Sequence, residues 1–292
     1  MVGTYICMRN ITMKRLLFYI LTVLSCLPAF SQTEGYVEHN LWNAEANDTF
    51  MIFADKAYIR HEPSIKAAIT DSLAIGSSVI LIKEEAGIPL MMKGILAPWK
   101  QVRYSVAGKE RKGYIWLGLL ALKHCSKDSI DFLYGIDKVK TDASVKYFIQ
   151  VKAVDQRSKI LDMEEFSVPG SVYAISTESK ILSDMGLEKL ESILRISFSG
   201  DSGEARGIPT NYYYFGWTGT KFLSLPGKSV VSEAGIFYYG DTLLYPKETG
   251  GEPGKIIKIT LDGETCEDGR KIINRNNSRE VYVWDGQKAV KQ

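Results

Sequence analysis

The chain has 292 residues, of which 45% are hydrophobic and 24% are charged, and its formal net charge is +2. This composition excludes a collagen, a coiled coil and a disordered polyelectrolyte, and 4 cysteines are too few for a disulfide-dense miniprotein. A net charge near zero gives no electrostatic reason to expect a nucleic-acid-binding protein. The length predicts one large domain or two ordinary ones.

Residues 13–32 have the charge and hydropathy order of a secretory signal. Lys14 and Arg15 precede the apolar run Leu16–Leu27, and small residues around Ser31 match the positions that a signal peptidase reads. The apolar run is shorter than the roughly 20 residues that a helix needs to span a bilayer. The pattern therefore predicts a cleaved signal peptide and a protein that is not integral in the membrane.

We expect the signal peptide to cover residues 1–31, with Met13 as an alternative start, and the mature protein to be secreted or periplasmic. A loose match to a lipoprotein processing site makes lipid attachment through Cys26 the alternative. Cleavage would leave only Cys125 and Cys266. These two could form one disulfide in an oxidising compartment, or they could remain separate buried thiols.

After a polar leader over residues 32–49, residues 50–122 contain short β-type segments separated by turn residues. Short strands at such close spacing predict a small barrel. The expected strands are Met51–Ala54, Ala57–Arg60, Ser78–Ile82, Trp99–Ser105 and Gly113–Trp116.

The order of motifs in this region resembles that of bacterial SH3-like domains of the cell envelope. The matching pieces are Ala57-Tyr58-Ile59-Arg60, Pro63-Ser64, Leu73, Gly76, Val79, Trp99, Val102 and Gly113-Tyr114-Ile115. The resemblance implies a barrel whose aromatic groove recognises cell-wall peptide or another extended peptide. The positions nearest the family's motif are Tyr58, Arg60, Trp99, Tyr114 and Trp116, although Trp99 and Tyr114 are equally suited to the core.

One departure from that family is the long connection over residues 84–98, which is rich in apolar residues. Exposed apolar side chains in a connection are costly, and methionine suits adaptable contacts. We therefore expect Leu90, Met91 and Met92 to contact the C-terminal domain, with a site for a partner protein as the alternative.

Residues 123–135 are charged and predict a linker, and residues 136–292 predict a larger β-rich domain, either a β-sandwich or a partial propeller. Within it, Phe215–Lys221 and Tyr282–Lys288 share the pattern aromatic-x-Trp-x-Gly-x-Lys. Because glycine adopts positive φ without a steric penalty, each pattern predicts a two-residue hairpin. A third hairpin is expected at residues 239–242, and a short helix over residues 184–195.

Five consecutive aromatic and glycine residues, at positions 212–216, directly precede Trp217. Side chains alternate along a strand, so Tyr213, Phe215 and Trp217 should share one face and Tyr212 and Tyr214 the other. The first set suits the core. The tyrosine pair Tyr212 and Tyr214 is a candidate contact for a partner or for another domain.

Catalytic motifs are scarce in the sequence. No histidine follows His124, which excludes a Cys-His or Ser-His-Asp hydrolase built within the C-terminal half. No metal-binding or phosphate-loop motif is present, so we expect no cofactor and no metal.

Together these observations predict an all-β, non-enzymatic envelope protein whose SH3-like barrel binds cell-wall peptide or another extended peptide. The first alternative is a protein–protein interaction scaffold that uses the C-terminal aromatic strands. The second alternative is a carboxylate-dependent glycan hydrolase, which needs only two acids in a groove. Its candidate acids are Glu164, Glu165, Asp201 and Glu204.

Overall fold

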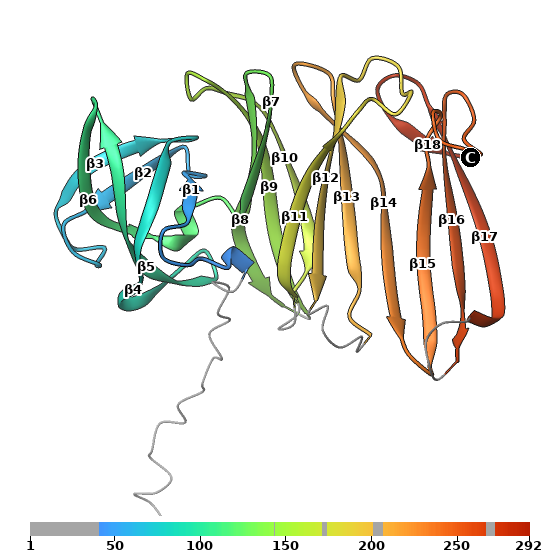
Figure 1. Cartoon of the computed structure of the whole chain (residues 1–292), viewed down its shortest axis with the longest axis horizontal. Helices are drawn as coiled ribbons and strands as arrows, with labels where there is room; N and C mark the ends of the chain where they lie inside the picture. The colour runs from blue at the N-terminus through green and yellow to red at the C-terminus, as the bar shows by residue number, and fades with distance from the viewer. Residues whose placement is uncertain (1–40, 143, 171–173, 201–206, 267–271) are drawn as a thin grey trace, which may run out of the picture. The chain divides into compact units, whose positions relative to one another are not determined.

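The structure is a computed structural model that describes residues 41–292 except 143, 171–173, 201–206 and 267–271 (Figure 1). Strands make up nearly all of the regular structure in this part of the chain, together with the short 3-10 helix η2 (Leu117–Leu119). The predicted all-β class is therefore confirmed. The expected signal peptide and the first half of the expected leader lie outside the described residues.

The first sheet contains the region whose motifs resemble SH3-like domains, and it is antiparallel with the strand order β1-β4-β5-β6-β2-β3. Within the described ranges, β1 and β3 are its two edges, so pairing does not close it into a barrel. The motif residues Ile59, Val79 and Ile115 are fully buried in its core. Its strands are β1 (Thr49–Met51), β2 (Lys56–Arg60), β3 (Ile69–Ala74), β4 (Ser78–Met92), β5 (Ile95–Val106) and β6 (Lys109–Trp116).

The connection predicted over residues 84–98 is a continuation of strands β4 and β5. The two strands form one long hairpin with several register shifts, and it turns at Lys93 and Gly94, both with positive φ. Register shifts of this kind bend and twist a hairpin. The hairpin therefore reaches beyond the first sheet, and the tip of the hairpin contacts β8: the amide of Val139 donates to the carbonyl of Lys93 at 2.9 Å.

The second sheet is antiparallel and has the order β10-β9-β8-β7. It begins inside the segment that we expected to be a linker: the expectation over residues 123–135 is wrong, because this segment forms β7 and the start of β8. Phe132 and Leu133 at the start of β8 are both buried, and because successive side chains of a strand point to opposite faces, both faces of the sheet are covered there. The strands are β7 (Lys123–Lys127), β8 (Ile130–Thr141), β9 (Val145–Asp155) and β10 (Ile160–Pro169).

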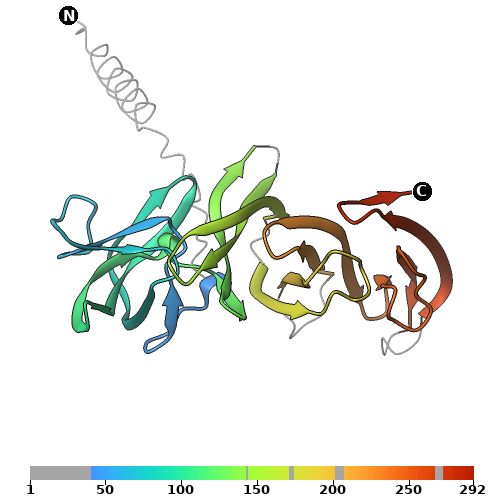
Figure 2. The same cartoon turned by 90° about the horizontal axis from the view of Figure 1, so that it is seen from above.

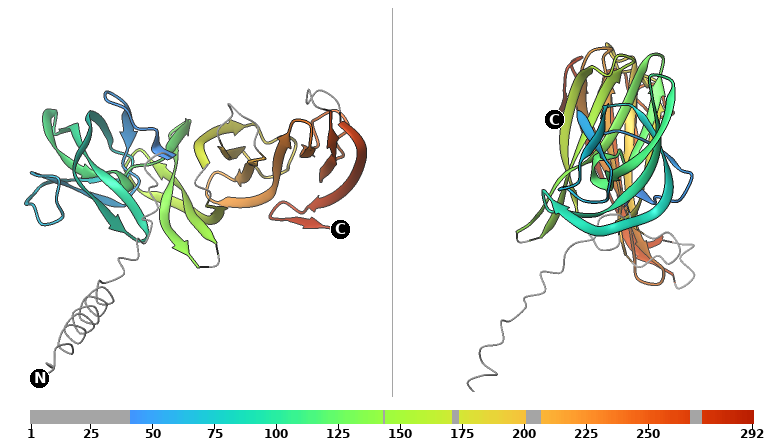
Figure 3. Two further views of the ribbon diagram at one scale, coloured as in Figure 1. Left: turned by 90° about the horizontal axis from the view of Figure 1, so that it is seen from below. Right: turned by 90° about the vertical axis from the view of Figure 1, so that its left-hand side faces the viewer.

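The third sheet is a single meander in which β11 to β18 pair in chain order. In Figure 2 and in the left panel of Figure 3, its last strands curl so that β18 returns toward β14, and these two strands are in contact. Its strands are β11 (Ala174–Leu182), β12 (Ser192–Gly200), β13 (Thr210–Trp217), β14 (Phe222–Glu233), β15 (Phe237–Leu244), β16 (Lys255–Thr265), β17 (Ile272–Trp284) and β18 (Ala289–Lys291).

The second and third sheets pack face to face through aromatic side chains. The ring of Phe132 lies 5.4 Å from that of Trp217, and the ring of Phe166 lies 4.6 Å from that of Tyr213 and 5.2 Å from that of Phe215. This contact is of the β-sandwich type. It also confirms that Tyr213, Phe215 and Trp217 share the core face of β13.

Both predicted glycine hairpins are present. Gly219 and Gly286 have φ of 90° and 85°, and each turn is closed by a backbone hydrogen bond, from Thr218 to Lys221 and from Asp285 to Lys288. The hairpin expected at residues 239–242 is wrong: these residues lie inside β15.

The helix expected over residues 184–195 is also wrong. A turn occupies the first part of this segment, and β12 begins at Ser192. Leu187 and Leu190, which gave the segment its helical spacing, are buried against the face of the third sheet that carries Tyr214. A short apolar run can satisfy this packing without a helix, so tertiary contacts decide its structure.

Candidate functional site

A cleft of about 560 Å³ lies where the first two sheets meet. One of its lining residues, Phe53, packs its ring where Gly135 of β8 provides no side chain: a Cβ on Gly135 would lie 2.7 Å from that ring. The lining residues are Phe53, Ala54, Asp55, Lys56, Met92, Lys93, Ile95, Trp116, Gly118, Leu119, Ile136, Asp137, Gln150, Lys152, Ile160 and Met163.

The only lysine of the cleft that is buried is Lys152, on β9, whose side chain is 6% exposed. Its ammonium lies 4.4 Å from the centroid of the Phe53 ring and donates to the Phe53 carbonyl at 3.3 Å and to the Asp55 carboxylate at 2.8 Å. An ammonium has three donors, so these two hydrogen bonds leave one available. The side chain of Asp55 is 74% exposed, so the bound carboxylate partner of this buried cation faces solvent.

A second charged group stands at the rim of the cleft. The Asp137 carboxylate accepts from Lys93 at 2.6 Å, and Lys138 lies 3.6 Å away. Burial would raise the pKa of Asp137, but the hydrogen bond and charge of Lys93, with the charge of Lys138, outweigh burial and lower it. Asp137 is therefore ionised at neutral pH, and it holds the β4–β5 tip against β8.

Replacing Asp137 by asparagine should lower the free energy of unfolding at pH 7 by about 0.5–1 kcal/mol, because Lys93 is largely exposed and exposed ion pairs contribute little. The pKa of Asp137 is lower in the folded state, so its contribution is complete above the unfolded-state pKa and is lost as the pH falls through the folded-state value. Urea unfolding at pH 7 and at about pH 2.5 measures this difference. Asp128→Asn, at an exposed turn, is the control and should leave the free energy of unfolding at pH 7 within about 0.5 kcal/mol of wild type.

Apolar side chains from three segments form the rest of the cleft. The indole of Trp116 is fixed because its Nε1 donates to the carbonyls of Leu90 and Ala97 at 3.0 and 2.9 Å. Met92 comes from the β4–β5 hairpin and Met163 from β10. A mainly apolar lining with a few charged groups is the usual composition of a ligand cleft.

The five residues carried over from the SH3-like resemblance do not converge on one groove. Trp116 lines the cleft, and Trp99 is buried at 4% exposure. Arg60 is engaged by its own loop, since its guanidinium donates to the Ala67 carbonyl at 2.6 Å. Tyr58 is exposed, and Tyr114 is half-buried and accepts from Gln101.

The apolar residues of the hairpin lie in three different settings. Leu90 and Met92 pack against the main core, while Met91 is 47% exposed. On β13, Tyr214 is buried and Tyr212 is half-buried, and both belong to the apolar cluster on the opposite face from Trp217. Of the two tyrosines that we expected to contact a partner or another domain, only Tyr212 is therefore accessible to a partner.

The remaining candidate residues are not assembled into a site. Cys125 and Cys266 are both free thiols, and burial raises the pKa of Cys125. Glu164 and Glu165 are consecutive on β10 and so point to opposite faces of the sheet. Asp201 and Glu204 lie outside the described residues. The described part of the chain contains no cluster of three or more His, Cys, Asp or Glu residues placed to hold a metal ion.

Sequence reasoning missed Lys152, Asp55, Asp137 and Gln150. One signal was available for Lys152, which lies within the mainly apolar run Ile149–Val154. Alternation along a strand places its side chain on the other face of the strand from Val151 and Ala153. A lysine inside a buried strand needs a partner. The partner itself could not be inferred, because Asp55 is distant in the chain.

Comparisons with protein-family models, with curated proteins and with solved structures found no match. Among the residues that the structure describes, no helix is long and apolar enough to cross a membrane.

Proposed function

We propose that this protein is a non-enzymatic envelope binding module, and that the cleft between its first two sheets holds a short extended peptide that carries a free carboxylate. The observation that carries the proposal is the setting of Lys152. Its ammonium is buried in the cleft, yet its carboxylate partner Asp55 is mostly exposed. A peptide carboxylate can therefore replace Asp55 without leaving a buried anion behind.

The rest of the cleft supports a peptide as the ligand. Met92, Trp116 and Met163 offer apolar contacts for side chains, and Gln150 adds a polar side chain to the lining. The fixed carboxylate of Asp137 at the rim suits an amino group of the ligand. Cell-wall peptides carry both carboxylates and amines, in agreement with the expected secretion and the SH3-like resemblance of the first sheet.

The experiment is calorimetric titration of the chain from residue 32 with soluble peptidoglycan stem peptides. Lys152→Met keeps the apolar stem and removes the charge, so it should weaken binding about tenfold or more, as expected for a hydrogen bond to a charged group. Lys146→Met is the matched control, because Lys146 lies on the same strand but is exposed. Circular dichroism checks that both variants are folded.

Two results would contradict the proposal. The first is that the wild-type protein binds neither the stem peptides nor intact peptidoglycan. The second is that Lys152→Met binds as tightly as Lys146→Met, which would place the ligand elsewhere.

A further inference from the structure

A row of cationic and aromatic side chains crosses three neighbouring strands of the third sheet, far along the chain from the cleft. Arg195 of β12 lies opposite Tyr214 of β13, and Tyr212 of β13 lies opposite Lys228 of β14. The guanidinium carbon of Arg195 and the ammonium of Lys228 lie 5.5 and 4.8 Å from the centroid of the Tyr212 ring. Figure 1 shows the three strands side by side.

Neither cation of this row has an acidic partner among the described residues. No described carboxylate lies within ion-pair distance of Arg195 or Lys228, and the buried Nε of Arg195 has no hydrogen-bond partner. A buried donor without a partner is rare and requires an explanation. Two neighbouring cations without a counter-ion also require an explanation.

The acidic residues near this row already accept hydrogen bonds from other groups. Asp241, which is fully buried, binds Lys258 at 2.8 Å, the Thr260 hydroxyl at 2.7 Å and the backbone amide of Ser229 at 3.0 Å. Glu248 accepts from the backbone amide of Tyr245 at 2.8 Å. These carboxylates moderate the local charge, but they are held by their own donors.

Two further tyrosines, Tyr214 and Tyr245, belong to the apolar cluster that contains Tyr212. Tyr245 is 3% exposed, its hydroxyl is buried without a partner, and its ring lies 6.2 Å from that of Tyr214. Burial raises the pKa of Tyr214 to about 12, so this hydroxyl stays protonated at neutral pH. Burial first, and then the charge of Arg195, lowers the pKa of Lys228. A bound anion would raise the pKa of Lys228 again, and it would accept a hydrogen bond from a protonated tyrosine hydroxyl.

We infer that Arg195, Tyr212 and Lys228 form a binding site for an oxyanion, a carboxylate or a phosphate group of a small ligand. The planar guanidinium of Arg195 presents parallel N–H donors that match two oxygens of such a group, and Lys228 contributes a point charge. The Tyr212 ring holds the two cations in place by cation–π contacts. The site is separate from the peptide cleft and does not depend on it.

The test follows the Nε–H signal of Arg195 by NMR in the chain from residue 32 labelled with ¹⁵N-arginine. Sodium phosphate and sodium acetate are titrated in separate arms at fixed ionic strength, which distinguishes phosphate from carboxylate as the preferred group. Arg195→Lys assigns the signal by removing it. We expect a saturable shift with at least one anion, weakened at least tenfold in Lys228→Gln. Lys221→Gln, an exposed lysine just before β14, should leave the affinity unchanged.

A linear shift without saturation in both arms would overturn the inference, as would equal affinity in wild type and Lys228→Gln. If Lys228→Gln does not fold, the wild-type titration still decides, because a bound oxyanion must move the Arg195 signal saturably.

Discussion

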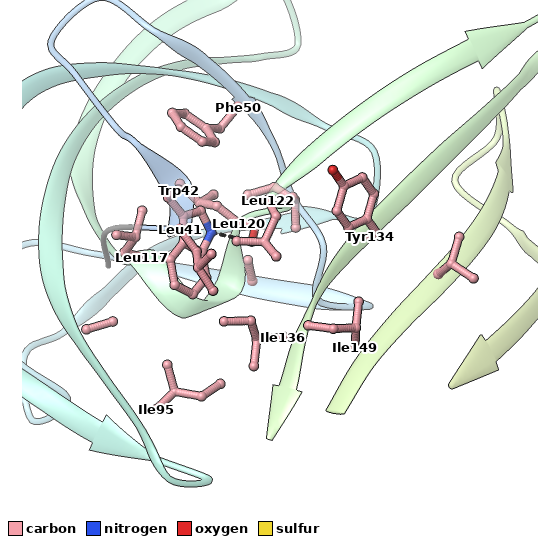
Figure 4. Close-up of a cluster of buried hydrophobic side chains, with 14 of the residues drawn as sticks. Leu41, Trp42, Phe50, Ile95, Leu117, Leu120, Leu122, Tyr134, Ile136 and Ile149 are labelled. Atoms are coloured by element: carbon pink, nitrogen blue, oxygen red, sulfur yellow. Dashed lines mark hydrogen bonds between the residues drawn. The ribbon is translucent and has the colours of Figure 1, made fainter. Parts of the chain in front are cut away.

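Replacing Trp42 by alanine should lower the free energy of unfolding by about 3–5 kcal/mol, the range for removing a large aromatic side chain from a core. The side chain is fully buried, and its Nε1 donates to the carbonyl of Leu120 at 3.0 Å. Figure 4 shows it between Leu41, Leu117 and Leu120. Because a domain is stable by only about 5–15 kcal/mol, this loss is a large part of the total. Urea unfolding of the chain from residue 32 measures it.

Trp42→Phe separates packing from the hydrogen bond. This variant keeps most of the apolar contact but loses the donor to Leu120, so its destabilisation should be smaller, at about 1–3 kcal/mol. A Trp42→Ala variant as stable as wild type would show that this segment does not belong to the core. The segment was expected to be a polar leader, since one tryptophan among polar residues gives no periodic signal, and only the core contacts identify it.

Local patterns predicted the features that depend on near neighbours. The face alternation of Tyr212 to Trp217 holds because successive strand side chains point to opposite faces regardless of the fold around them. The hairpins at Gly219 and Gly286 hold because positive φ is a local requirement. The hairpin expected at Gly240 fails because a glycine in a strand can also serve close packing: a Cβ there would lie 2.2 Å from the Tyr238 hydroxyl.

The candidate cleft depends on contacts that no local pattern contains. Its residues come from the start of β2, the β4–β5 tip, the end of β6 and strands β8 to β10. Trp116 was predicted from the SH3-like resemblance, and the structure places it in the lining. Lys152 and Asp55 lie 97 residues apart, so their pairing follows only from the packing of the first sheet on the second.

Replacing Gly94 by alanine should detach the β4–β5 tip from β8 and lower the free energy of unfolding by about 2–5 kcal/mol. The left-handed conformation costs an L-residue about 1–2 kcal/mol, and Gly94 has φ of 80°. A Cβ would also lie 2.3 Å from the Val139 carbonyl, and overpacking of this kind typically adds about 1–3 kcal/mol. Urea unfolding measures the total.

Gly108→Ala is the matched control, because Gly108 also turns a hairpin, with φ of 74°, but has no atom within 4 Å of the added Cβ. It should therefore lose only the conformational term, about 1–2 kcal/mol. Since Met92, Lys93 and Ile95 line the cleft, Gly94→Ala should in addition weaken peptide binding, whereas Gly108→Ala should not. Equal destabilisation by the two substitutions would show that the tip does not rest on β8. The cleft would then lose one of its walls, and the peptide proposal would lose its geometric basis.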